Sequence, residues 1–230
     1  MRLSLCLALA VCCGCTGLSG VRAPAAGVAQ PAPTFTADAV MPDNSVGRID
    51  LADLRGSYVI LVFYPADFSF VCPTEIIAYD KDLAEFEKRD CRVFGVSVDS
   101  TDTHVRWKRT SRDDGGVGPI RYPLIADTSK RLARLYGVLS PKARARRATF
   151  LIDRTGTIRH LLVNDDAVGR RVGDTLRVLD AVRLVDANPK VCPANWKKGD
   201  TGIAPTPESV IEYLRQHAAN RTPTTRPAER

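Results

Sequence analysis

The chain has 230 residues, of which 44% are hydrophobic and 26% charged, and its formal net charge is +7. This length fits one domain with extensions, and the charged fraction is that of an ordinary globular protein. Three of the seven cysteines, Cys72, Cys91 and Cys192, lie beyond the first fifteen residues. That number excludes a disulfide framework and suggests one working pair of thiols and one spare.

Residues 1–32 have the parts of a secretory leader. A basic residue, an apolar run over 3–13 and a Gly-, Ala- and Pro-rich stretch follow one another, and Gly27–Ala29 fits a cleavage site before Gln30. The run is too short for a mature membrane anchor, which needs ~20 residues. The leader favours an exported protein, whether periplasmic, secreted or membrane-tethered. The alternative is a disordered leader or a misassigned start codon on a cytoplasmic protein.

Predicted strands and helices alternate over residues 33–188. Strands are expected at 58–64, 91–98, 122–125, 149–152 and 157–163, and helices from Pro73 onward and at 101–112, 128–136 and 173–185. The first strand, YVILVFY, is apolar throughout and is therefore expected to be buried on both faces. Thr101 or Asp102 is the expected cap of the second helix, and Asp153–Gly156 has hairpin-turn chemistry. This order predicts one α/β domain with a mixed sheet.

Residues 189–220 are expected to form a C-terminal arm outside the domain. The segment 189–207 contains Pro and Gly, and a short helix is predicted at 207–218, with Thr206 and Pro207 as its start signal. Residues 221–230 are expected to be a disordered tail.

Two clusters of basic residues carry much of the positive charge. They are Arg106, Lys108, Arg109 and Arg112, and Lys142, Arg144, Arg146 and Arg147. Nucleic-acid binding would require aromatic residues among these charges or a helix that could enter a groove. Neither is evident, so no nucleic-acid partner is expected. Apart from Arg147, both clusters are expected to form a solvated face.

Cys72 directly precedes Pro73, a residue that is tolerated in the first turn of a helix. This position places the sulfur at a helix N-terminus, where free backbone N–H groups and the positive end of the helix dipole favour an anion. The thiolate is the nucleophilic form of cysteine. A reactive cysteine is therefore one interpretation, and a buried structural cysteine at a strand–helix junction is the other.

Two segments around the cysteines resemble a known family. FYPADFSFVCPTE (63–75) is similar to the active-site segment of the peroxiredoxins, and VCPANWKKGD (191–200) is similar to the resolving-cysteine segment of their typical two-cysteine class. That class includes the alkyl hydroperoxide reductase peroxidase subunits and thioredoxin peroxidases. The resemblance extends from about residue 33 to 218 and implies a thioredoxin-like fold, with a central mixed sheet flanked by helices.

The resemblance also implies roles for individual residues. Cys72 would be the peroxidatic nucleophile, Pro65 would shield it from water, and Ser69, where the family more often has Thr, would offer its hydroxyl. Arg147 would bind the thiolate and the peroxide oxygens, and Glu75 would orient that arginine through an ion pair.

Two further positions, Arg170 and Cys192, complete the implied site. Arg170 matches a second arginine near the site. Cys192 would resolve the sulfenic acid of Cys72 in the partner subunit through an intersubunit disulfide, the alternative being a static structural bridge. Cys91 is expected to be a buried or half-buried bystander. Arg146 could compete with Arg147, but strand alternation is expected to point it to the opposite face.

The implied function is a thiol-dependent peroxidase that reduces hydrogen peroxide and organic hydroperoxides. No cofactor and no metal are expected, because Cys72, Cys91 and Cys192 lack paired metal-ligand spacing. Beyond the leader the chain has no CxxC reductase motif, so an external thioredoxin-like or flavoprotein disulfide reductase is implied as electron donor. A homodimer, and a ring of dimers such as a decamer, follow from the resemblance. The alternative function is a redox sensor or holdase-like chaperone that uses the same cysteines.

The chain departs from the family pattern at three places. Gly115–Gly118 reads Gly-Gly-Val-Gly rather than Gly-Gly-Leu-Gly, Tyr213-Leu214 replaces a Tyr-Phe pair, and Asp166-Ala167 stands where Leu-Pro is usual. Leu214 removes an aromatic contact that would hold the arm in place. We therefore expect more resistance to overoxidation than in a Tyr-Phe member.

Overall fold

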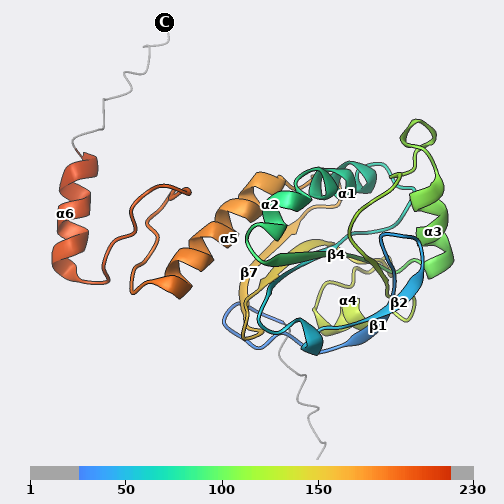
Figure 1. Cartoon of the computed structure of the whole chain (residues 1–230), viewed down its shortest axis with the longest axis horizontal. Helices are drawn as coiled ribbons and strands as arrows, with labels where there is room; N and C mark the ends of the chain where they lie inside the picture. Colours follow the sequence, from blue (N-terminus) through green and yellow to red (C-terminus); the bar gives the residue numbers. More distant parts are fainter. Residues whose placement is uncertain (1–25, 219–230) are drawn as a thin grey trace, which may run out of the picture.

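The computed structural model describes residues 26–218, and these residues are built around a seven-stranded sheet (Figure 1). The sheet has the order β2-β1-β5-β4-β3-β6-β7. The strands are β1 (Thr36–Val40), β2 (Val46–Asp50), β3 (Tyr58–Phe63), β4 (Cys91–Ser97), β5 (Leu124–Ala126), β6 (Arg147–Ile152) and β7 (Ile158–Asn164). The helices are α1 (Cys72–Lys81), α2 (Leu83–Glu87), α3 (Thr101–Arg109), α4 (Arg131–Leu135), α5 (Val172–Ala187) and α6 (Pro207–Ala218).

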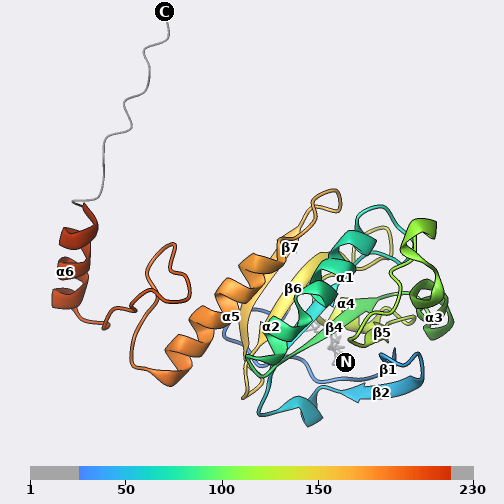
Figure 2. The ribbon, with the colours of Figure 1, turned by 45° about the horizontal axis from the view of Figure 1, so that its top comes forward.

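Strand β3 lies inside the sheet, between β4 and β6, and is buried along its whole length. It pairs parallel with β4 and antiparallel with β6, so the predicted mixed sheet is confirmed. Its side chains alternate between two cores: Val59, Leu61 and Phe63 pack on one face, and Ile60 and Val62 on the other. Helices α1, α2 and α5 cover one face of the sheet, and α4 covers the other (Figures 1 and 2).

Helix α1 begins at Cys72, one residue before the predicted start at Pro73. Tyr79 and Asp80, which interrupt the apolar pattern of this helix, are both buried. They can be buried because their polar atoms have partners: the Tyr79 hydroxyl lies 3.1 Å from the hydroxyl of Thr175, and Asp80 accepts a 2.7 Å bond from the backbone of Arg121.

The boundaries of the next helices differ from the prediction. Ser100, rather than Thr101 or Asp102, caps α3, because its hydroxyl accepts a bond from the backbone N–H of Thr103. The helix ends at Arg109, and residues 112–114 form a separate 3₁₀ turn. Helix α4 begins three residues later than predicted, after Lys130 in a left-handed conformation. The β1–β2 hairpin was not predicted, since its short segments lack a clear apolar period, and the single helix expected from Pro73 onward is divided into α1 and α2.

Lys108 does not belong to the solvated basic face to which the sequence assigned it. The residue is 3% exposed, and its ammonium group donates to the carbonyls of Met41 and Pro42 in the turn between β1 and β2. The long side chain reaches these acceptors from α3 because that helix packs against β1. Arg106, Arg109 and Arg112 remain exposed as predicted.

Residues 26–32 pack against the hairpin formed by β6 and β7. Ala29 donates a backbone bond to Ile158, whose own N–H donates back to Gln30. Ala26 and Ala32 belong to the core on the face of the sheet that includes Val59, Leu61 and Phe63. The rest of the predicted leader, residues 1–25, and the tail beyond 218 lie outside the described residues. None of the helices over 26–218 combines the length and apolarity needed to cross a bilayer.

The arm follows α5 and extends away from the sheet (Figures 1 and 2). Val191 and Ile203 form an isolated bridge that closes a loop, and Trp196 is 3% exposed within it. Helix α6, at the predicted bounds, leaves Val210, Ile211 and Leu214 exposed. The apolar side of α6 is therefore not covered by residues 26–218.

Replacement of Lys108 by Met is expected to change how stability depends on pH. Burial lowers the pKa of Lys108 to about 8, whereas an unfolded lysine titrates near ~10.4. Between these values the unfolded chain binds more protons than the folded one, so the stability of the wild type rises with pH. From pH 7.5 to 9.5 the wild type should gain ~1–2 kcal/mol relative to Lys108→Met in urea unfolding.

The exposed Lys142 supplies the control. Lys142→Met should keep the pH dependence of the wild type. If Lys108→Met and the wild type gain stability in parallel over this range, the buried ammonium group is not the cause.

Candidate active site

The loop after the C-terminal end of β3 leads to Cys72, which lies at the start of α1. Phe68 adopts a left-handed conformation in this loop (φ 51°), and Phe70 is fully exposed. Cys72 itself is fully buried and opens α1, and Val71 before it offers no side-chain cap. The sulfur therefore lies at the positive end of the α1 dipole, while the N–H groups of Thr74 and Glu75 donate to the carbonyl of Val71.

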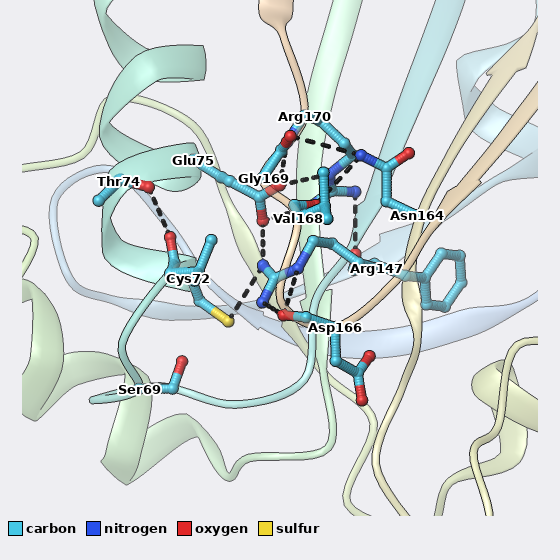
Figure 3. Close-up of polar contacts among 12 residues, drawn as sticks. Ser69, Cys72, Thr74, Glu75, Arg147, Asn164, Asp166, Val168, Gly169 and Arg170 are labelled. Carbon is cyan, nitrogen blue, oxygen red and sulfur yellow. Dashed lines mark hydrogen bonds and ion pairs between the residues drawn. The ribbon is translucent and has the colours of Figure 1, made fainter.

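Arg147 faces this sulfur from the first position of β6 (Figure 3). The register places it there: Ala148 pairs with Phe63 at the end of β3, next to the loop that leads to Cys72. Its Nη1 donates to the sulfur at 3.6 Å, and the residue is 3% exposed. Arg146 is exposed on the opposite face, as strand alternation predicts.

Glu75 joins the two arginines of the site. One of its oxygens accepts from Nη1 of Arg147, and Arg170 donates to both oxygens at 2.9 Å and also from its backbone N–H at 2.7 Å. Burial opposes ionisation of Glu75, but Arg170 and Arg147 outweigh it and lower the pKa of the carboxyl. Burial likewise opposes the charge on Arg147, yet Glu75 and Cys72 raise the pKa of the guanidinium.

Arg170 does not face the sulfur. Its fully buried side chain donates to the backbone carbonyls of Phe63 and Ala148 and to the hydroxyl of Thr149. These bonds fix the guanidinium between the ends of β3 and β6. Arg170 therefore acts on Arg147 through Glu75, as a positioning residue.

The predicted roles of Ser69 and Pro65 have less direct geometric support. The hydroxyl of Ser69 donates its proton to the carbonyl of Ala66 at 2.9 Å, and among residues 26–218 it makes no hydrogen bond to the sulfur of Cys72. Its oxygen keeps lone pairs that can accept a bond. Pro65 begins the loop directly after the last buried residues of β3, where it is partly exposed.

A buried pair, Asp67 and His104, supports the loop and was not predicted. Nδ1 of His104 lies 2.7 Å from Asp67, and both side chains are fully buried. Tyr64 donates to the same carboxylate at 2.8 Å, and Asp99 accepts the backbone N–H of Asp67. The sequence carries no local signal for this pair, because its members lie 37 residues apart.

The backbone carbonyl of Asp166 is the second contact that the sequence did not indicate. It accepts bonds from Nη2 and Nε of Arg147 at 2.9 and 3.3 Å (Figure 3). The pairing of Arg147 with Asn164 across β6 and β7 brings this loop to the guanidinium. A carbonyl contact depends on register and not on side-chain type, so no residue pattern could reveal it.

Cys192 lies in the arm that follows α5 in the chain. Its sulfur contacts the carbonyl of Ala181 at 3.6 Å, and burial raises the pKa of its thiol despite the nearby Arg177. Cys91 is 2% exposed at the start of β4, and burial raises the pKa of its thiol as well. All three cysteines of the described chain are unpaired.

Two family models match most of the described chain. The AhpC/TSA family model covers residues 28–161, and the model of the C-terminal domain of 1-Cys peroxiredoxin covers 181–216. The chain belongs to the AhpC/TSA family. It is a peroxiredoxin, and hence a thiol-dependent peroxidase. The second model is named for one-cysteine members, but the residues that it matches here include Cys192.

Individual relatives agree with this assignment. Peroxiredoxin-2 of Rattus norvegicus is 47% identical over 191 residues, which cover 83% of this chain and 96% of the relative. Peroxiredoxin-1 of Gallus gallus is 46% identical, with coverage of 81% and 94%. The reduced 2-Cys peroxiredoxin of Plasmodium vivax is 44% identical and superimposes with a TM-score of 0.82, over 84% of this chain and all of that one. The predicted thioredoxin-like peroxiredoxin fold is therefore confirmed.

Removal of the carboxylate of Asp67 is expected to destabilise this peroxiredoxin strongly. Asp67→Ala would leave His104 and the hydroxyl of Tyr64 buried without their partner, at a cost of ~3–5 kcal/mol. Urea unfolding at pH 7 measures the loss. Asp102→Ala, at an exposed position in the first turn of α3, should cost less than ~1 kcal/mol; similar losses in the two variants would contradict the structural role of the pair.

Proposed function

We propose that Cys72 is the peroxidatic nucleophile and that Arg147 is its electrophilic partner. The observation that carries this proposal is the guanidinium, which lies 3.6 Å from the sulfur with both groups buried. The thiolate attacks one oxygen of the peroxide, an S–O bond forms, and the O–O bond breaks. The departing oxygen takes a proton and leaves as water or an alcohol, and Cys72 becomes a sulfenic acid.

In this proposal the remaining site residues prepare the charge distribution before substrate arrives. Glu75, held by Arg170, keeps Arg147 fixed, so the guanidinium can stabilise the negative charge that develops on the leaving oxygen. Ser69 accepts a hydrogen bond from the peroxide through its free lone pairs. Pro65 shields the sulfur from water at the mouth of the loop.

Cys192 is proposed to resolve the sulfenic acid of the partner subunit. Its thiol condenses with the S–OH group, a disulfide forms and water leaves. Disulfide formation needs Cα atoms within ~7 Å, yet in one chain the sulfur of Cys192 lies against the carbonyl of Ala181 in α5, and Cys72 opens α1. A second chain satisfies the distance more simply. Because Cys72 is fully buried, the first turn of α1 must unfold locally before the bond forms.

The assembly that follows is a homodimer, with a ring of dimers such as a decamer as its larger form. The exposed apolar side of α6, formed by Val210, Ile211 and Leu214, supports a role for the arm in contacts with a second copy. We assign residues 33–188 to the catalytic domain and 189–220 to the arm. A Plasmodium yoelii relative modified at its N-terminus is described as forming an artifactual octamer.

The electron donor is proposed to be an external dithiol, of the thioredoxin-like or flavoprotein disulfide reductase type. Beyond residues 1–32, the chain has no CxxC motif with which to reduce its own disulfide. A Plasmodium yoelii relative that is 49% identical over 75% of this chain is described as a thioredoxin peroxidase. A dithiol regenerates both cysteines by thiol–disulfide exchange and becomes oxidised itself.

Substitution of each cysteine by serine tests the assignment. Cys72→Ser should lose at least ~10³-fold in the rate of peroxide consumption, since a hydroxyl cannot replace the thiolate. Cys192→Ser should react once and stop with an added oxygen atom on Cys72, detected by mass spectrometry. Cys91→Ser is the matched control and should turn over with a dithiol reductant. Turnover by Cys72→Ser, or a wild type that reacts once without turnover, would contradict a peroxidase based on Cys72.

A change of Leu214 to Phe tests the expected resistance to overoxidation. An added aromatic ring should increase the contacts of the arm, slow its unfolding and give a second peroxide more time to reach the sulfenic acid. Peroxide titration during turnover should inactivate Leu214→Phe at a lower concentration than the wild type. Val210→Leu, on the same exposed side of α6, controls for added apolar surface without an aromatic ring. Equal inactivation of wild type and Leu214→Phe would reject the expectation.

A further inference from the structure

Asp166 contacts the site through its backbone and carries its charge on an exposed side chain. Its backbone carbonyl binds the guanidinium of Arg147, whose Nη1 contacts the sulfur of Cys72. A single guanidinium thus links the backbone of Asp166 to the reacting atom. The carboxylate of the same residue is exposed and points away from the guanidinium (Figure 3). The residue whose backbone binds Arg147 therefore also carries a negative charge, and this charge does not pair with the guanidinium.

The loop that carries Asp166 is well supported. Asp165 accepts a 2.9 Å bond from the backbone of Ala167, and Asn164 donates to the carbonyls of Val168 and Gly169 at 3.1 and 3.4 Å. Over residues 26–218, by contrast, the carboxylate of Asp166 takes part in neither a hydrogen bond nor a salt bridge. The backbone of this residue is fixed, while its charge is free to act on an approaching molecule.

The other charges of the site do not cancel this one. Glu75 pairs with both Arg147 and Arg170, so its single negative charge balances one of the two positive charges. The thiolate of Cys72 balances the other. Asp165 is also exposed beside Asp166, so the loop that binds Arg147 carries two exposed carboxylates. Such charges act over about the Debye length, ~8 Å at physiological ionic strength, and change the local concentration of charged substrates.

We propose that Asp166 makes the site selective for neutral peroxides against hydroperoxides that carry a negative charge close to the O–O bond. The disfavoured class includes hydroperoxides with a nearby carboxylate. Hydrogen peroxide and neutral alkyl hydroperoxides meet no such barrier. This inference rests on the proposed function, because it assumes that the peroxide is attacked by Cys72 beside Arg147.

The test compares two substrates of the same shape and different charge. Cumene hydroperoxide is neutral, and its para-carboxylate derivative carries a charge on the same rigid frame. Stopped-flow measurement gives the rate constant for oxidation of Cys72 by each, and the readout is the ratio of the charged to the neutral substrate. Asp166→Asn keeps the backbone carbonyl and removes the charge; this ratio should rise by ~2–5-fold. Asp166→Lys should raise it further, and 0.5 M salt should reduce both effects.

The exposed Asp113, in the 3₁₀ turn after α3, provides a control with the same change in net charge. Asp113→Asn should leave the ratio at its wild-type value. If Asp166→Asn and Asp166→Lys also leave the ratio unchanged while both substrates react, this inference is overturned and the proposed function stands. If neither substrate oxidises Cys72 in the wild type, the proposed function itself fails.

Discussion

The geometry of the site depends on one carboxylate held between two guanidinium groups. Glu75 pairs with Arg147 on one side and with Arg170 on the other, and all three are nearly inaccessible to solvent. A buried charge cluster of this kind costs desolvation energy and is no strong argument for stability. What it provides is a fixed orientation: Arg147 faces Cys72 and is not free to turn toward water. Loss of Glu75 would leave two positive charges buried side by side.

The fold brings these groups together from three separate segments: α1, β6 and the loop before α5. Strand β3 ends where the loop to Cys72 begins, and the antiparallel pairing of β3 with β6 places Arg147 beside that point. The pairing of β6 with β7 then returns the chain so that the loop before α5 contributes Arg170. Strands β3 and β6 are buried along their whole length, and their side chains alternate between the two faces of the sheet. A shift of one residue in this pairing would turn Arg147 to the opposite face.

The rigid site and the mobile steps of the reaction lie in different parts of the molecule. The sheet and the charge cluster are fully packed, whereas the arm makes few contacts with the domain and ends in a helix whose apolar side is exposed. Peroxide attack needs a preorganised site. Disulfide formation needs local unfolding of a buried helix start and movement of an arm, which regions of low local stability allow.

The sequence by itself determined the segments that carry chemistry. The apolar run before Pro65, the Cys72-Pro73 junction and the second Val-Cys-Pro at Cys192 are local patterns, and a helix start or a buried strand follows from local sterics and hydrophobicity. The tertiary structure alone decided which distant groups meet. The burial of Lys108, the pairing of Asp67 with His104 and the carbonyl contact of Asp166 depend on strand register and helix packing, because contacts between segments far apart in the chain have no signature in the residues beside them.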